Sequence, residues 1–236
     1  MIVMFRKKPI LEYESSLEIY TDPITPSKKH IPEWYKNIPK WKNNEMFSIE
    51  NGLQYTIKSC VPFLDSLTTG YMITLPYDIY IKNDNGMPYL TWADGVKFPP
   101  KWRKEVADQN IVPFEHSPIE YTWNYCVSFR VPKGYSFLFT HPLNRHDLPF
   151  TTLSGVIDGD FVMYAHGNVP FYIKKDFEGL IPQGTPIAQI IPFRQESWQS
   201  KKTKGLEKIG NLHNDQGQNV FYGWYKKIFW KRKNYN

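Results

Sequence analysis

The sequence is poor in cysteine and has no long apolar run. It holds two cysteines in 236 residues, Cys60 and Cys126, which are too few for a disulfide framework. Apolar runs such as residues 187–193 are far too short to cross a bilayer. The amino end, MIVMFRKKPI, has no apolar stretch of signal-peptide length. We therefore expect a soluble, cytoplasmic protein without a transmembrane segment.

The familiar sequence signatures of catalysis are missing as well. The chain contains no P-loop, no GxSxG elbow and no CxxC pair. A cysteine nucleophile would need a positioned base, and the sequence nominates none. We interpret both cysteines as buried apolar thiols.

Arginine is scarce, and the positive charge is unevenly distributed. The chain has 23 lysines and 6 arginines against 23 acidic residues, which gives a net charge of +6. Residues 1–200 carry 20 basic and 21 acidic side chains, whereas residues 201–236 carry nine basic and two acidic ones. We expect a nearly neutral domain over 1–200 and a basic, aromatic extension over 201–236.

Short apolar segments, separated by Gly, Pro and Asp-Gly, make up most of the chain. The stretch IEYTWNYCVSFRV at 119–131 predicts one long strand, and Asn85-Gly86 predicts a hairpin turn. In HIPEWYKNIPKW at 30–41 the apolar residues fall three or four apart, which predicts a short helix. The pattern indicates a mostly β fold of the barrel or sandwich type, with a helical amino-terminal segment and a hairpin insertion.

The stretch NVFYGWYKKIFWKRK at 219–233 interleaves six aromatic with five basic residues. Lysines of such a segment can follow a phosphate backbone while the rings stack on bases. The same segment can lie on an anionic surface, or pack on protein. We expect packing on its own body or on a partner, with nucleic acid or an anionic surface bound through 201–236 as the alternative.

Three sequence motifs follow one another with regular spacing in the second half of the chain. They are Pro132-Lys133-Gly134-Tyr135, GVIDGDF at 155–161, and GTPIAQII at 184–191. Over residues 130–193 the chain resembles the dUTP pyrophosphatase and dCTP deaminase superfamily, and Thr69-Gly70-Tyr71 loosely resembles its first motif. The resemblance implies a dUTPase-like distorted β-barrel, also described as β-clip or jelly-roll-like, and a homo-trimer.

The whole chain is also similar to a family of bacterial and phage proteins without an assigned activity, through HIPEWYKNIP, SCVPFLDSLTTGYM and PFRQESW. This likeness implies a phage or bacterial origin, and the host cytoplasm or the virion as the place of a phage protein. It supplies no chemistry.

The superfamily resemblance implies a set of site residues. Asp158 would be the base that activates water, which requires an ionised carboxylate within hydrogen-bond reach of that water. Phe161 would pack on the deoxyribose, and Gln189 would contact phosphate or base. The candidate ligand-binding residues are Phe161, Gln189, Arg145, Asn144 and Asp160.

The chain departs from the superfamily pattern where phosphate would be held. The consecutive serines of the phosphate loop are absent from residues 140–145, and Thr185-Pro186 replaces the arginine after the turn glycine. A triphosphate needs several converging donors. We therefore predict a non-catalytic or degenerate dUTPase-like protein with a binding or structural role, its ligand a nucleotide or another anion. The alternative is an active nucleotide hydrolase or deaminase, which would use Mg²⁺ and contacts from Arg145, Arg194 and the tail lysines.

A second alternative depends on the polar loop at 141–147. His141, His146 and Asp147 contain the two histidines and one carboxylate of a facial metal triad. Such a triad would suit a metal-dependent β-barrel oxygenase. Because His146 and Asp147 are adjacent in a loop, we expect no metal and no other cofactor, and we interpret the loop as polar and anion-binding through Arg145.

Overall fold

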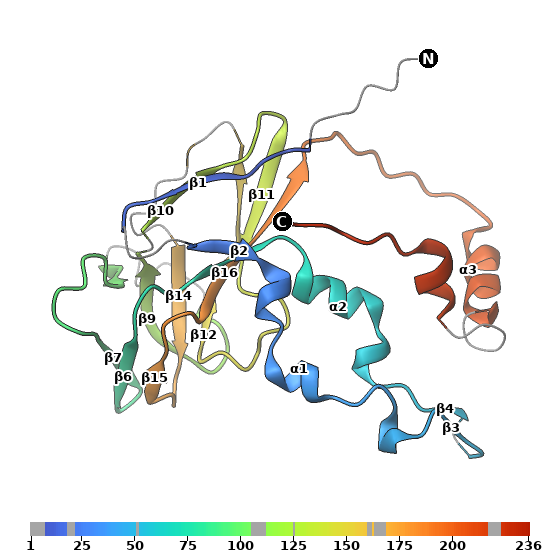
Figure 1. The fold of residues 1–236 in the computed structure, drawn as a ribbon, viewed down its shortest axis with the longest axis horizontal. Helices are drawn as coiled ribbons and strands as arrows, with labels where there is room; N and C mark the ends of the chain where they lie inside the picture. The colour runs from blue at the N-terminus through green and yellow to red at the C-terminus, as the bar shows by residue number, and fades with distance from the viewer. Residues whose placement is uncertain are drawn as a thin grey trace. The chain divides into compact units, whose positions relative to one another are not determined.

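The computed structural model describes residues 8–17, 22–50, 52–104, 112–124, 126–159, 162, 169–216 and 223–236 (Figure 1). By their internal contacts the residues group into two compact units. Unit 1 lies within residues 1–32, 66–195 and 235–236, and unit 2 lies within residues 33–65 and 196–234. The boundary expected at residue 200 concerns independent folding and stays a prediction.

Unit 1 contains a five-stranded sheet in which every neighbouring pair is antiparallel. Its strands, in spatial order, are β13 (Gly155–Asp158), β11 (Tyr135–Thr140), β16 (Pro186–Arg194), β5 (Tyr71–Thr74) and β2 (Ile24–Pro26). The short helix η1 (Ser27–His30) follows β2. The strands of two resemblance motifs, β13 and β16, therefore lie on the two sides of β11, which pairs with both.

Three further antiparallel sheets complete unit 1. A four-stranded sheet runs in the order β12 (Phe150–Thr152), β14 (Val169–Lys174), β9 (His116–Trp123) and β8 (Lys101–Trp102). A three-stranded sheet contains β15 (Gly179–Ile181) and the hairpin of β6 (Ile79–Asp84) with β7 (Met87–Thr91), whose turn is the expected Asn85-Gly86. A two-stranded sheet pairs β1 (Glu12–Ser15) with β10 (Val127–Arg130).

The mostly β prediction is confirmed, but the expected closed barrel is not found. Within the described part of the chain the strands form separate open sheets, and none closes on itself. A barrel closes only when its edge strands pair along their length. The edge strands β2, β8 and β12 have two or three residues each, so they offer few backbone groups for such pairing.

The core of unit 1 is aromatic and connects the sheets. The rings of Trp123 and Phe171 are stacked with centroids 3.5 Å apart, and Phe150 meets Trp123 edge-on at 4.9 Å. Phe129 and Phe137 add a second ring pair at 5.0 Å. Each of these side chains is at most 1% exposed, so apolar burial and ring packing together stabilise the fold.

The prediction of a single long strand over 119–131 is wrong in one respect. The structure divides it into β9 and β10, which belong to different sheets. The alternation is nevertheless preserved, because Tyr121, Trp123, Val127 and Phe129 all lie in the core. The break depends on pairing of β10 with β1, more than a hundred residues away, which local sequence patterns do not report.

Unit 2 contains short helices and one small hairpin. Its elements are α1 (Glu33–Asn37), η2 (Lys42–Asn44), β3 (Phe47–Ser48), β4 (Gly52–Leu53), η3 (Ile57–Ser59), the start of α2 (Val61–Thr68), α3 (Leu206–Asp215) and the π-helical turn η6 (Tyr225–Phe229). The helix predicted within 30–41 is confirmed as α1, and the ring of Tyr35 on α1 stacks on Phe63 of α2 at 5.8 Å.

The two cysteines differ in burial. Cys126 is buried as predicted, whereas Cys60 is exposed, because it lies between η3 and α2 at the surface of unit 2. Of the helices in the described residues, none is long and apolar enough to span a bilayer.

Candidate functional site

Asp158 lies at the end of β13 and is bonded within its own sheet. The hydroxyl of Ser136, directly opposite on β11, donates to Asp158 Oδ1 at 2.8 Å. The amide of Gln195 donates to the same oxygen at 3.2 Å and to Ser136 Oγ at 2.9 Å. The three side chains form one polar network at the edge of the five-stranded sheet, so this Asp158 oxygen already accepts two internal hydrogen bonds.

The glycine after Asp158 is required by a close backbone approach. Gly159 donates its amide to the Tyr135 carbonyl at 2.8 Å, and a Cβ on Gly159 would lie 2.3 Å from that oxygen and 2.9 Å from the Pro132 carbonyl. No real side chain tolerates such distances. The GVIDG turn is therefore packed directly on the Pro132–Tyr135 turn, which explains why both motifs are present together. Asp160 and Phe161 lie outside the described residues.

Gln189 on β16 is fully buried and hydrogen-bonded on both ends of its amide. Its Oε1 accepts from the Leu143 amide at 2.8 Å, and its Nε2 donates to the carbonyls of Ser66 and Thr69 at 3.0 and 2.7 Å. Gly70, next to Thr69, approaches so closely that a Cβ would lie 2.0 Å from the Ile190 carbonyl oxygen. The Thr69–Tyr71 and IAQ motifs are thus joined by backbone packing.

These two joined pairs of motifs lie at opposite ends of β11. Asp158 stands opposite Ser136, whereas Gln189 stands opposite Thr140, four residues further along the strand and on its other side. At about 3.3 Å per residue and 4.8 Å per strand, their backbones are roughly 16 Å apart. Within one chain the structure does not bring Asp158 and Gln189 into a common site.

The loop at 141–147 is held together by its own side chains. Arg145, with a side chain only 10% exposed, forms a bidentate pair with Asp147 through Nε at 2.9 Å and a terminal nitrogen at 2.8 Å. Its remaining terminal nitrogen reaches the His30 carbonyl at 3.4 Å. Asn144, at a positive φ of 59°, donates to Ser66 Oγ at 2.6 Å. Both candidate ligand contacts are thus used to fix the loop.

His141 is held neutral by its surroundings. The pKa of His141 is lowered to about 4, mainly by burial and to a smaller extent by the charges of His146, Arg145 and Lys174, whereas a hydrogen bond to the Arg145 backbone opposes the shift. The Thr152 amide donates to Nδ1 at 3.3 Å, so Nε2 carries the proton and donates to the Arg145 carbonyl at 3.1 Å. Both ring nitrogens are therefore engaged inside the protein.

The metal triad considered for this loop is not assembled. His146 is exposed, and its carbonyl accepts a hydrogen bond from Lys174 Nζ at 2.6 Å. Among the residues that the structure describes, no three His, Cys, Asp or Glu side chains are grouped in a way that would hold a metal ion.

A buried ionic group on the four-stranded sheet was missed by sequence reasoning. Glu120 on β9 has no exposed surface; its carboxylate pairs with Arg103 at 2.9 Å and accepts from the Tyr172 hydroxyl at 2.8 Å. Glu120 alternates with the core residues Ile119 and Tyr121, so the sequence pattern placed it on a solvent-facing side. The sequence pattern around Glu120 does not indicate that this second face of the sheet is also buried.

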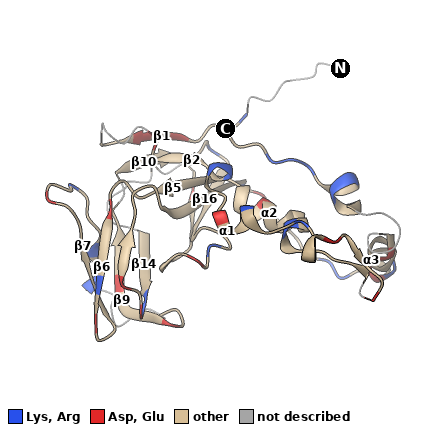
Figure 2. Cartoon of the chain, turned by 60° about the horizontal axis from the view of Figure 1, so that its bottom comes forward, with Lys and Arg blue, Asp and Glu red and all other residues tan. Residues whose placement is uncertain are grey.

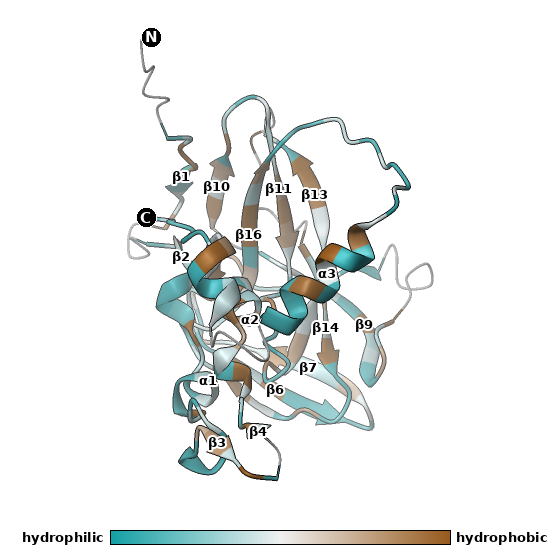
Figure 3. Cartoon of the chain, turned by 90° about the vertical axis from the view of Figure 1, so that its right-hand side faces the viewer, coloured by the Kyte–Doolittle hydropathy of each residue, from teal (hydrophilic) through white to brown (hydrophobic). Residues whose placement is uncertain are grey.

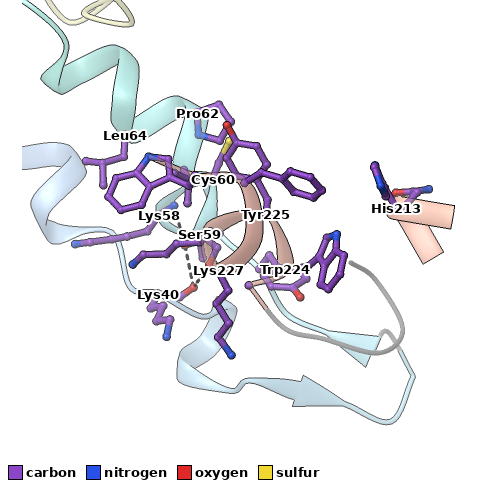
Figure 4. A pocket seen from close by; sticks show the side chains of 18 of the residues that line it. Lys40, Lys58, Ser59, Cys60, Pro62, Leu64, His213, Trp224, Tyr225 and Lys227 are labelled. Atoms are coloured by element: carbon purple, nitrogen blue, oxygen red, sulfur yellow. Dashed lines mark hydrogen bonds between the residues drawn. The ribbon is translucent and has the colours of Figure 1, made fainter. Parts of the chain in front are cut away.

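Unit 2 contains a large cavity. Its volume is about 1440 Å³, and its walls come from residues 40–64 and 210–230 (Figure 4). The lining residues used below are basic and aromatic: Lys40, Lys58, Lys226, Lys227, Tyr55, Trp224, Tyr225, Phe229 and Trp230. We call this cavity the basic aromatic pocket. None of the described residues that line it is acidic.

The end of the pocket-forming tail is fixed to α2 by polar contacts. The indole Nε1 of Trp230 donates to both carboxylate oxygens of Asp65, at 2.9 and 3.1 Å. Lys233 forms an ion pair with the same carboxylate. Asp65 therefore has its charge compensated inside unit 2, and the tail is not a free extension at this point.

The charge of the chain is concentrated in unit 2. Its sequence ranges hold 13 basic and 7 acidic residues, a net charge of +6, whereas the ranges of unit 1 hold 16 of each. Figure 2 marks the basic and acidic residues of the described part of the chain. Along the sequence, the basic excess lies in 201–236. The structure adds Lys40 and Lys58 from the amino-terminal half to the same cavity, a juxtaposition for which the sequence gives no local signal.

Comparison with known proteins identifies no family. A scan against protein-family models finds no match, and a search of the curated proteins finds none either. Among solved structures the chain is similar to the native dUTPase of EIAV, with 12% identical residues and a TM-score of 0.32. The match covers 83% of this chain and 99% of that chain, and it is a weak resemblance in fold.

Proposed function

We propose that this protein binds an anionic ligand without hydrolysing it, and that unit 1 is a degenerate dUTPase-like scaffold. The observation that carries the proposal is the network of Asp158 with Ser136 and Gln195. A general base must direct a lone pair at a water beside the substrate. Here one carboxylate oxygen, Oδ1, accepts two bonds within the sheet edge, which favours a role in the fold.

The other candidate contacts support the same proposal. Arg145 is paired with Asp147, and the amide of Gln189 is saturated by backbone groups. Phosphate recognition relies on charge-assisted bonds from donors that are free to converge on the ligand. Recruiting Arg145 or Gln189 would first break contacts that hold the 141–147 loop.

We place the anion in unit 2 rather than in unit 1. The basic aromatic pocket has four lysines and, among its described lining residues, no carboxylate. Unit 2 also carries the entire net charge of the chain. Lysine ammonium groups around a concave surface raise the local concentration of anions and favour their binding.

An assay of nucleotide hydrolysis tests the first half of the proposal. The full chain is incubated with Mg²⁺ and each deoxynucleoside triphosphate in turn, and released pyrophosphate and ammonia are measured. We expect no release above that of Asp158→Asn. Turnover of any triphosphate that Asp158→Asn abolishes would overturn the proposal in favour of the hydrolase or deaminase, and iron bound stoichiometrically to the purified protein would favour the oxygenase.

A homo-oligomer, the trimer that the superfamily resemblance implies, is part of the same proposal. Val156 on β13 is 63% exposed and Phe193 on β16 is 42% exposed. The register places both on one face of the five-stranded sheet, together with Leu138. Light scattering should give the mass of three chains; the mass of a single chain would contradict this assembly.

A further inference from the structure

The basic aromatic pocket is larger than a typical small-molecule site. Its volume of about 1440 Å³ exceeds the roughly 300–1,000 Å³ usual for pockets that enclose one small ligand. Both chain segments that form it contribute lysines and rings: Lys40, Lys58 and Tyr55 from one, and Lys226, Lys227 and four aromatic residues from the other. Size alone therefore favours an extended ligand, of which several units occupy the pocket at once.

Two lysines of the pocket, Lys58 and Lys226, lie close to aromatic faces. The ammonium of Lys226 is 6.0 Å from the centre of the Trp230 ring, and that of Lys58 is 5.7 Å from the centre of the Tyr35 ring. In Figure 4 the labelled Lys40, Lys58 and Lys227 side chains lie on the other side of the view from His213. Ammonium groups and rings are thus found together in this part of the pocket.

The rings of the pocket are accessible to a ligand. Tyr225 and Phe229 on η6 are 46% and 45% exposed, and Tyr55 on the opposite segment is 44% exposed. Large aromatic side chains in a protein interior would be nearly fully covered, as they are in unit 1. An exposed ring offers a flat face on which a planar group can stack.

Rings and ammonium groups that line the same pocket suit a single nucleic acid strand, in which each planar base carries a phosphate. Proteins that bind single strands combine a basic groove with aromatic stacking platforms. Sequence-specific binding additionally needs bidentate donors such as arginine or glutamine on the base edges. The described lining has no arginine and no glutamine and a single asparagine, Asn214, so the ligand would be bound mainly through shape and charge.

A membrane surface fits the pocket less well. Lipid headgroups approach a flat or convex protein surface, whereas the rings and lysines here line a hollow. Aliphatic side chains that a bilayer would take up are also found on α3, where Leu206, Ile209 and Leu212 are each more than half exposed (Figure 3). Of these three, none lines the pocket.

We infer that the basic aromatic pocket binds single-stranded nucleic acid with little sequence preference. Bases stack on Tyr225, Phe229 and Trp230, and phosphates are neutralised by the pocket lysines. The inference rests on the proposed function, since it names the class of anion that unit 2 binds. It predicts a clear preference for a single strand over a duplex, because only unpaired bases expose their faces.

Fluorescence anisotropy of the full chain with labelled dT15 and a 15-base-pair duplex tests the inference. The wild-type protein should bind dT15 at least about tenfold more tightly than the duplex. Tyr225→Leu should weaken binding of dT15 by roughly tenfold, whereas Tyr225→Phe should retain it, because stacking on one ring contributes about 1–3 kcal/mol. Equal affinity for duplex and single strand, or a Tyr225→Leu variant that binds dT15 as tightly as the wild type, would overturn the inference.

A charge-matched pair of variants separates the pocket from general attraction. Lys226→Gln with Lys227→Gln removes two pocket lysines, and Lys201→Gln with Lys202→Gln removes two lysines of unit 2 that do not line it. The Lys226→Gln, Lys227→Gln variant should reduce the magnitude of the slope of log affinity against log salt concentration by about 1.4, because each lost phosphate contact accounts for about 0.7. Equal effects of the two pairs would contradict binding in the pocket.

Two further probes distinguish failure of the inference from failure of the proposed function. If dT15 does not bind but dTTP or anionic vesicles of phosphatidylcholine and phosphatidylserine do, the inference is overturned and the proposed anion binding stands. If neither dT15 nor dTTP nor the vesicles bind at low salt, both are overturned. Circular dichroism of each variant confirms that loss of binding is not loss of folding.

Discussion

The hydroxyl of Ser136 donates a hydrogen bond of 2.8 Å to the carboxylate of Asp158, and the two residues stand opposite each other on β11 and β13. In a hydrolase the aspartate of this motif would face a water and a phosphate. In this chain Oδ1 of that carboxylate accepts bonds from its strand partner and from Gln195. We propose that the motif stabilises the edge of the sheet.

Replacing Asp158 by Asn should reduce stability. The amide is a weaker acceptor than the carboxylate for Ser136 and Gln195, so the free energy of unfolding should fall by about 1 kcal/mol. Urea unfolding measures the change. Asp176→Asn, in an exposed turn, is the control and should stay within about 0.5 kcal/mol of the wild type. Equal midpoints for Asp158→Asn and the wild type would show that the network is not stabilising.

Replacing Gly70 by Ala should be much more costly than the same change at Gly134. Both glycines have positive φ, 73° and 81°, so both variants carry a backbone cost of about 1 kcal/mol. Only at Gly70 would the new Cβ meet a backbone atom, the Ile190 carbonyl oxygen at 2.0 Å; at Gly134 nothing lies within 4 Å. Thermal unfolding should show a loss of more than about 3 kcal/mol at Gly70, and similar losses at the two sites would refute the close approach.

Gln189→Leu should destabilise unit 1 by about 2–4 kcal/mol, because it leaves the Leu143 amide and the Ser66 and Thr69 carbonyls without their partner. Gln183→Leu, on an exposed turn, is the matched control. Chemical denaturation of both variants provides the measurement. A Gln189→Leu variant as stable as the control would return Gln189 to the candidates for ligand contact.

The free energy of unfolding should decrease as the pH falls through the range between the two pKa values of His141. Its pKa is 6.5 in the unfolded chain and about 4 in the folded one, so between these values the unfolded state binds more protons. The free energy of unfolding therefore falls as pH decreases from 6.5 to about 4, and this contribution is constant below 4. In His141→Gln the urea midpoint should depend less on pH between 6.5 and about 4. In His146→Gln, at an exposed position, the midpoint should change with pH as in the wild type. Parallel slopes for His141→Gln and the wild type would contradict the assignment.

Local patterns predicted the elements of this fold better than their assembly. The hairpin at Asn85-Gly86 and the helix within 30–41 depend on residues close in sequence, and both are found. The glycines of the resemblance motifs also have a physical reason, because Gly70 and Gly159 allow backbones to touch. The break between β9 and β10 and the open sheets depend on long-range pairing, which no short pattern contains.

The candidate sites show the same limit. Sequence reasoning selected Asp158, Gln189 and Arg145 for chemistry, but it could not see that Ser136, Thr69 and Asp147 would use their polar groups. It recognised the basic and aromatic tail, yet not that Lys40 and Lys58 join it, since almost 170 residues separate Lys58 from Lys226 in the sequence. Spatial partners of this kind become visible only in the folded chain.

Hydrogen exchange of the full chain with and without saturating dT15 tests the central claim most directly. The account predicts slower exchange at 55–64 and 223–230, the two segments that form the basic aromatic pocket, and unchanged exchange in β11, β13 and β16. Protection confined to those three strands, with the pocket segments unchanged, would contradict it and return the ligand site to the β unit.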